Sequence, residues 1–388
     1  MYDAIVIGAR CAGSPTAMLL ARRGLKVLLL DRATFPSDTI STHILWPHGA
    51  EVLARWGLLR RLAATGAPPI CRHMTFDVGP FALRGTIPDA NDGRGGFCPR
   101  RTVLDQILVH AAVESGVELR EAFAVDELLM DGDVVAGVRG RGRSGRPVDE
   151  RARIVIGADG GKSFVASRVH APEYDTRPVA ACGYYSYFSG VDQDDIELYV
   201  REHHALGGAP TNDGLHLVMV NWPSQEFARV RAGVDDAVAR ALDSAPDFAR
   251  RVRAGRREDK WYGVAGVPGY FRKPFGPGWA LVGDAGYNRD PITAQGMSDA
   301  FIDAESVAAA IRDGLSGSGS LDAALTAHEA ARNERVRPMY EFTSHLARLE
   351  PPPPEMQALF GAMVGDRAKS DRFCRVVAGT ASPAELFA

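Results

Sequence analysis

The chain has 388 residues, of which 46% are hydrophobic and 24% are charged, as in an ordinary globular protein. A formal net charge of −3 gives no electrostatic reason to expect a nucleic-acid partner or an anionic membrane surface. The sequence contains no run of about 18 apolar residues, so we predict no membrane span. The length predicts about two domains.

The cysteines favour a reduced, cytoplasmic protein. The five cysteines are widely spaced and include no C-x-x-C pair, which is untypical of a disulfide framework or a zinc site. The first predicted strand starts at the N-terminus, so we expect no signal peptide. His203, His204 and His216 lack a further ligand at a usable spacing, and we therefore expect no metal site.

The first thirty residues predict a strand–turn–helix–strand unit. Residues 4–7 form a continuous apolar run, as expected for a strand buried on both faces of a parallel sheet. Residues 17–21 predict a helix that ends at Gly24. Residues 27–30 predict the second buried strand.

Three residues in this unit predict a dinucleotide site. Gly8 and Gly13 shape the turn, where backbone N–H groups and the positive end of a helix meet a pyrophosphate. Asp31 follows the second strand, where an acid accepts hydrogen bonds from ribose hydroxyls. The usual G-x-G-x-x-G pattern has a glycine in place of Arg10, so we expect a local adjustment of the loop.

The middle of the chain predicts a helix, a strand meander and a second sheet. The helix begins at Arg101 and ends near Gly116, and strands follow over residues 117–157. Asp159 comes just after the last of these strands. From about residue 176 to 268, apolar runs separated by polar or glycine-bearing turns predict an antiparallel sheet.

A short buried strand over residues 280–282 leads into a second candidate site. The sequence GDA follows it at 283–285, and Pro291 and Gly296 precede a helix. Asp284 is placed to accept hydrogen bonds from ribityl hydroxyls, and the N-terminus of the next helix is placed to face the flavin pyrimidine ring or the phosphates. These residues favour a flavin as the dinucleotide.

Four motifs occur in the order of a known family. They are the unit at 4–32, R-x-x-L-D at 101–105, GADG at 157–160 and GDA-(x)5-P at 283–291. On these motifs the chain resembles the single-component FAD-dependent monooxygenases of the para-hydroxybenzoate hydroxylase type, over residues 1 to about 305. It departs from them at Arg10 and at Ala294, where the family has a glycine in the flavin loop.

The resemblance implies an α/β fold in three parts. A discontinuous Rossmann-like FAD-binding domain is expected at residues 1–75, 100–175 and 269–315. An inserted antiparallel β-sheet substrate domain is expected at 76–99 and 176–268, and helices at 316–388.

The resemblance also implies the cofactors and the site. FAD and NAD(P)H are the expected cofactors. The expected FAD-binding residues are Gly8, Arg10, Gly13, Asp31, Arg32, Arg101, Val125, Asp159, Asp284, Pro291, Gly296 and Met297. His43, Tyr185 and Tyr187 are candidates for the substrate side, although ordinary loop or core positions explain them equally well.

The implied activity is hydroxylation or epoxidation of an aromatic or polyketide-like small molecule by O2, through a C4a-hydroperoxyflavin. A reductase acting on prenyl chains has similar FAD motifs, but the polar, aromatic-rich sheet argues against it. A flavin-dependent halogenase needs a lysine between flavin and substrate, and no lysine lies between Lys26 and Lys162. A non-enzymatic flavoprotein would leave the inserted domain without a purpose. The substrate and the oligomeric state stay open.

Overall fold

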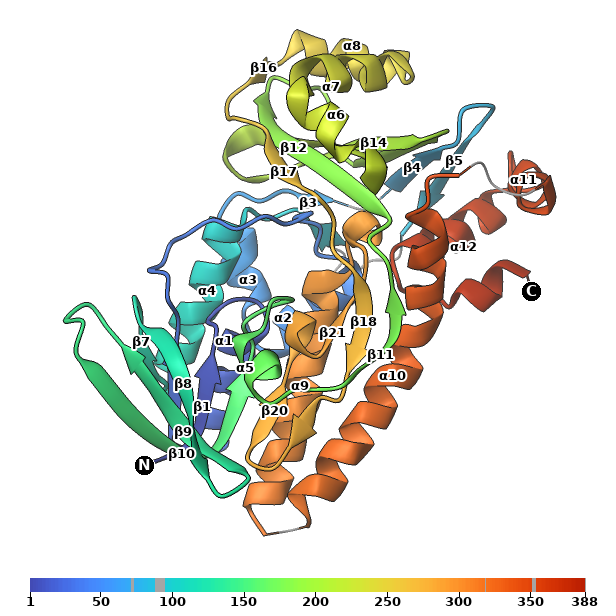
Figure 1. Cartoon of the computed structure of the whole chain (residues 1–388). Coiled ribbons are helices and arrows are strands. Elements are labelled where there is room, and N and C mark those ends of the chain that lie inside the picture. The colour runs from blue at the N-terminus through green and yellow to red at the C-terminus, as the bar shows by residue number, and fades with distance from the viewer. Residues whose placement is uncertain (71–72, 88–94, 318, 351–353, 388) are drawn as a thin grey trace.

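The computed structural model describes residues 1–70, 73–87, 95–317, 319–350 and 354–387 of the chain. These residues form two eight-stranded sheets, one above the other in Figure 1, with helices packed against both. A three-stranded sheet and the long helix α10 (Leu321–Leu346) complete the right-hand side of that view. The predicted α/β fold class is confirmed.

The first sheet has the predicted strand–turn–helix–strand unit at its centre. β1 (Tyr2–Ile7) lies between β2 (Val27–Leu30) and β10 (Pro147–Gly157) and runs parallel to both. Ala4 and Val6 face one side of the sheet and Ile5 the other, and none of these side chains is exposed. Burial on both faces therefore explains the continuous apolar run. The remaining strands of this sheet are β7 (Glu118–Arg120), β8 (Ala124–Asp131), β9 (Val134–Arg141), β19 (Phe275–Gly276) and β20 (Trp279–Leu281).

Helices cover this sheet on the side of Ala4 and Val6. Helices that contribute to the core there include α1 (Gly13–Ala21), α4 (Arg101–Glu114) and α9 (Gly296–Leu315). Helix α10 runs along α9, as the two orange helices of Figure 1 show. Other helices are α2 (Pro47–Arg55), α3 (Leu59–Ala63), α5 (Phe164–Arg168) and α11 (Pro354–Gly361).

The second sheet has β12 (Ala181–Ser189) and β15 (Leu215–Pro223) as an antiparallel pair at its centre. One of its contacts is parallel: β13 pairs with β4, from a distant part of the chain. The remaining strands are β4 (His73–Asp77), β5 (Ala82–Thr86), β13 (Ile196–Arg201), β14 (His204–Pro210), β16 (Arg256–Arg257) and β17 (Tyr262–Val264).

The prediction of sheet throughout residues 176–268 was wrong for its middle part. This part forms the helices α6 (Phe227–Ala232), α7 (Val234–Asp243) and α8 (Pro246–Ala254), at the top of Figure 1. Phe248, Leu242 and Val252 pack against Val218 and Val220 of β15. The helices therefore bury the face of the second sheet that points away from the first.

The remaining elements connect the two sheets. β11 (Glu173–Arg177), β18 (Gly269–Arg272) and β21 (Tyr287–Asn288) form the three-stranded sheet, and β3 (Pro69–Ile70) pairs with β6 (Gly96–Phe97). Helix α12 (Arg367–Val377) covers β4 and β5, where Phe373 meets Phe76. Short 3-10 turns are η1 (Asn212–Gly214), η2 (Ser224–Glu226), η3 (Gly283–Ala285), η4 (Pro291–Thr293) and η5 (Pro383–Phe387).

The domain boundaries stay a prediction, and two strands cross the positions expected for them. β4 spans the expected boundary at 75/76, and β11 spans the one at 175/176. Residues 88–94 of the expected substrate domain lie outside the described part of the chain. Among the described residues, no helix has the length and apolar character needed to cross a membrane.

Candidate active site

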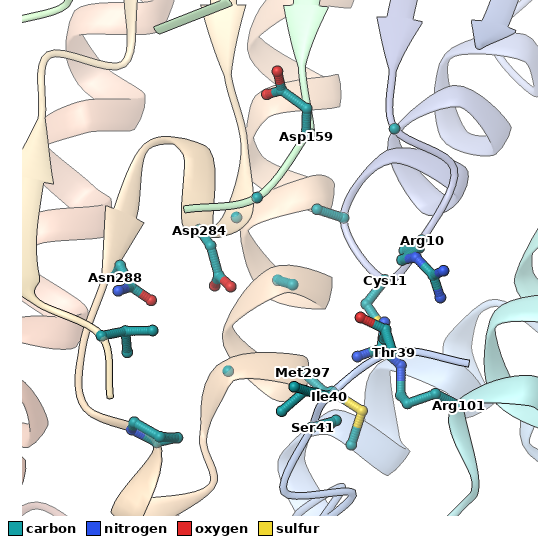
Figure 2. A pocket seen from close by; sticks show the side chains of 18 of the residues that line it. Arg10, Cys11, Thr39, Ile40, Ser41, Arg101, Asp159, Asp284, Asn288 and Met297 are labelled. Carbon is teal, nitrogen blue, oxygen red and sulfur yellow. The ribbon is translucent and has the colours of Figure 1, made fainter. Parts of the chain in front are cut away.

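One large cavity of about 940 Å³ lies between the two sheets. Its lower wall comes from the turn after β1, the end of β2, the start of α4, η3 and the start of α9. Its upper wall comes from β12, β15 and β17 of the second sheet. Figure 2 shows side chains from several of these segments converging on the same space.

The turn after β1 is shaped by its two glycines. Gly8 has φ +100°, and a Cβ there would lie 2.4 Å from the carbonyl oxygen of Ala158. A Cβ on Gly13 would lie 1.7 Å from the carbonyl oxygen of Gly8. The glycines thus let the turn, β10 and the start of α1 pack together at the edge of the cavity, as a phosphate-binding turn requires.

Asp31 is held by the backbone at the tip of β2. Its carboxylate accepts hydrogen bonds from the backbone N–H of Ala9 at 2.7 Å and of Ala33 at 2.8 Å. Arg32 and Val125 line the cavity beside it. The arrangement fits a ribose-binding edge, with the acid fixed in place before a ligand arrives.

Arg10, at the usual glycine position, joins a buried ionic cluster. It donates to Asp105 Oδ2 at 2.7 Å, and Arg101 donates to the same carboxylate from Nε and Nη2 at 3.0 to 3.1 Å. Asp105 is fully buried. Arg10 also donates to Ser37 and to the carbonyl oxygen of Asp38, so it ties the turn both to α4 and to the loop after β2.

Asp284 directs its carboxylate into the cavity, as Figure 2 shows. The side chain is exposed to this space, yet the surrounding protein removes much of its hydration. Burial therefore raises its pKa to about 6, although the charge of Arg101 opposes the shift. A ligand that donates hydrogen bonds to this carboxylate would stabilise its charged form.

The segment between η4 and α9 contains the other expected flavin residues. Pro291, Gly296 and Met297 all line the cavity. Ala294, at the position of a family glycine, takes the left-handed conformation with φ +54°. An alanine thus adopts the backbone shape for which glycine is the usual choice.

Asp159 lies at the cavity wall but is engaged with its own helix. It accepts from the Ser163 hydroxyl at 2.6 Å and from the backbone N–H of Phe164 at 2.7 Å, at the start of α5. Its part in FAD binding stays a prediction.

The three residues proposed for the substrate side form one aromatic cluster. Tyr185 lines the cavity and stacks on Tyr262, with ring centroids 5.3 Å apart. His43 lies behind it and shares a 2.8 Å hydrogen bond with the Tyr187 hydroxyl. His43 is completely buried, and burial lowers its pKa to about 3, so its imidazole is neutral. Of these three residues, Tyr185 lines the cavity, whereas His43 and Tyr187 do not.

These residues together fit FAD. One continuous cavity is lined by the glycine turn, by Asp31 at the ribose-binding position, by Arg101 and by the inward-facing Asp284. Consistent with this, the family of the FAD binding domain matches the chain over residues 1–343. The chain belongs to this family. It is an FAD-dependent oxidoreductase, and the resemblance drawn from its motifs is confirmed.

Two curated proteins that are similar to the chain in sequence differ in activity. The chain is 24% identical over 335 residues to a 1H-pyrrole-2-carbonyl peptidyl-carrier protein brominase of Pseudoalteromonas luteoviolacea, covering 81% of this chain and 78% of the relative. It is 29% identical over 319 residues to a digeranylgeranylglycerophospholipid reductase of Methanosarcina mazei, covering 77% and 72%.

Solved structures share the fold across nearly the entire chain. A flavin-dependent brominase superposes with a TM-score of 0.85 at 21% identity, covering 99% of this chain and 95% of that one. PqsL of Pseudomonas aeruginosa, in complex with 2-aminobenzoylacetate, superposes with a TM-score of 0.75 at 23% identity, covering 89% and 95%.

Several residues in and around the site were not predicted individually from the sequence. Asp105 belongs to the R-x-x-L-D motif, but its ion pair with Arg10 joins positions 95 residues apart. Met219 and Asn221 line the upper wall. The alternation within LHLVMVN places them on one strand face, but nothing in the sequence says that this face meets the cofactor domain.

Proposed function

We propose that this protein is an NAD(P)H-dependent FAD monooxygenase that hydroxylates or epoxidises an aromatic or polyketide-like small molecule. The observation that carries the proposal is the shared cavity, with cofactor-type residues on one wall and an aromatic and apolar wall opposite. Bound FAD, once reduced, supplies the oxygen chemistry by activating O2. A small molecule held between the two walls lies next to the flavin position.

The chain contributes binding, orientation and exclusion of water. Asp31, Arg101 and Asp284 would hold the FAD by its polar parts. Tyr185, Leu217 and Met219 give the opposite wall an apolar surface that holds a flat substrate and displaces water from the reacting position. We also propose a cytoplasmic location, where NAD(P)H is the reductant.

The test is a labelled-oxygen screen of the purified holoenzyme. Phenols and aromatic polyketides are incubated with NAD(P)H and isotopically labelled O2, and the masses of the products are measured by mass spectrometry. We expect one labelled oxygen in the organic product. Label found only in hydrogen peroxide for every compound would contradict the proposal. Separate assays with NADH and with NADPH would show which of the two is the reductant.

Halogenation is the second candidate, favoured by the brominase relative and its likeness over most of the chain. Lys162 is the lysine that lines the described cavity, and it belongs to the segment after Asp159 on the cofactor side. The same assay in bromide buffer distinguishes the two activities, since a brominated product would establish halogenation.

Reduction of a prenyl chain is also compatible with the archaeal reductase relative. Saturation of a geranylgeranyl substrate without incorporated label, together with no hydroxylated product in the screen, would establish that the protein is a prenyl reductase.

A further inference from the structure

The upper wall of the cavity is an ordered face of the second sheet. Successive side chains of a strand point to opposite faces, and opposed residues of paired strands point to the same face. β12 and β15 place Gly183 opposite Asn221, Tyr185 opposite Met219, and Tyr187 opposite Leu217. The face with Tyr185, Met219 and Asn221 is the one that lines the cavity.

Asn221 lies in a row of small neighbours on this face. Gly183 is opposite it on one side and Ala205 on the other. A Cβ on Gly183 would lie 2.5 Å from Asn221 Oδ1, so the missing side chain at 183 provides the space that the amide occupies. Asn221 is half-buried, and within the described parts of the chain its side-chain amide makes no hydrogen bond.

The neighbouring side chains of β15 and β17 that line this wall are apolar. Leu217, Met219 and Val264 line the same wall, and Leu217 is completely buried. A charged group placed against such a surface loses hydration without compensation, whereas an uncharged ring gains from the contact. A directional amide in an apolar wall recognises a matching polar group on an otherwise apolar ligand.

We propose that Asn221 is the specificity-determining residue of the substrate site, and that the substrate is an uncharged, flat molecule with a carbonyl group that accepts a hydrogen bond from this amide. This inference rests on the proposed function, because it takes the space below β12 and β15 to be the substrate site. Gly183 is a positioning residue, since it acts by leaving room for Asn221.

Binding to the oxidised holoenzyme tests this inference without turnover. Perturbation of the flavin absorbance gives dissociation constants for three probes: 4-hydroxyacetophenone, 4-ethylphenol and 4-hydroxybenzoate. The first two differ in a carbonyl group, and the third adds a negative charge. We expect 4-hydroxyacetophenone to bind roughly tenfold more tightly than 4-ethylphenol, and 4-hydroxybenzoate to bind most weakly.

Variants then assign the preference to Asn221. Asn221→Leu keeps the size of the side chain and should bring the ratio between the first two probes close to one. Gly183→Ala leaves Asn221 in place but fills its space, and should reduce the same ratio. Val218→Ile, an apolar exchange on the opposite face of β15 that does not line the cavity, is the control and should retain the ratio. Flavin content and thermal unfolding of each variant report on the fold.

The outcomes separate the inference from the proposed function. An unchanged ratio in Asn221→Leu, tightest binding of 4-hydroxybenzoate, or no binding of any probe would overturn the inference. Selective binding that depends on Asn221, combined with no labelled oxygen in any product, would support the inference and overturn the monooxygenase proposal.

Discussion

Asp284 illustrates how one residue serves the empty and the loaded protein differently. Its carboxylate faces the cavity, and burial raises its pKa to about 6. A folded-state pKa above the unfolded value means that this group contributes stability below about pH 4, and that the contribution is lost as the pH rises through about 6. A ligand that donates hydrogen bonds to the carboxylate reverses this disadvantage.

We therefore predict opposite effects of Asp284→Asn on stability and on cofactor affinity. Above pH 6 the FAD-free variant should unfold with a free energy about 1 kcal/mol higher than the unchanged protein, a value reduced because water in the cavity screens the charge. Its FAD affinity should fall by about 1–3 kcal/mol, because a charged acceptor is lost. Urea unfolding at pH 5 and pH 8, and titration of the apoprotein with FAD, measure the two effects.

The comparison between the two pH values is the internal control. At pH 5 the carboxyl is largely protonated, so the gain in stability from the substitution should shrink. An equal gain at both values would show that the ionisation of Asp284 is not its cause.

At the scale of single residues, the sequence predicted which side chains lie at the site better than it predicted their hydrogen-bond and ion-pair partners. Asp31 and Asp284, which were predicted to bind the cofactor, both line the cavity. The ion pair of Arg10 with Asp105 could not be derived, because it depends on how α4 packs beside the turn after β1. The hydrogen bonds of Asp159 to the start of α5 had a local signal, since Ser163 stands where a helix N-cap is favoured.

At the scale of elements, the turn between β1 and α1 has the least room for change. Gly13→Ala would place a methyl group 1.7 Å from the carbonyl oxygen of Gly8 and 2.9 Å from Ala158 Cβ. We predict a loss of about 1–3 kcal/mol in the free energy of unfolding, together with impaired FAD binding, because the turn must open. Thermal unfolding with and without FAD measures both.

Gly319→Ala is the matched control, since no atom lies within 4 Å of a Cβ at that exposed position. It should leave both quantities unchanged. Normal FAD affinity in Gly13→Ala would show that the turn adapts without affecting the site.

Local patterns predicted the elements around this turn well and those above it less well. β1, α1, β2 and α4 follow from apolar runs, glycine stops and helical spacing. The helices α6–α8 had a usable signal, because Val238, Ala241 and Leu242 repeat at helical spacing, but the strands on either side obscured it. The parallel pairing of β13 with β4 had none, since it joins segments about 120 residues apart.

At the scale of the molecule, both sheets line the cavity, so FAD bound there would connect them. β1 and α9 contribute to one wall and β15 to the other. FAD at a hundredfold excess over its dissociation constant should add about 2.7 kcal/mol to the free energy of unfolding. We predict that it slows amide hydrogen exchange in β15 as well as in β1, as mass spectrometry of peptides from both strands can measure.

The helices α6–α8 provide the reference for this experiment, because they cover the far face of the second sheet and do not line the cavity. Their exchange should slow less than that of β15. Protection confined to β1 and α9 would contradict the view that FAD bridges the two walls.

The position of the cavity also has a consequence for the biogenesis of the protein. Gly8 and Met297 line the same space, so the residues that line the cavity are spread over about three quarters of the chain. A ribosome must therefore translate past the start of α9 before a complete FAD site can exist, and α12, which covers β4 and β5, emerges later still. Flavin loading is in this respect a late event in synthesis, because most of the chain must emerge before the walls of the cavity can meet.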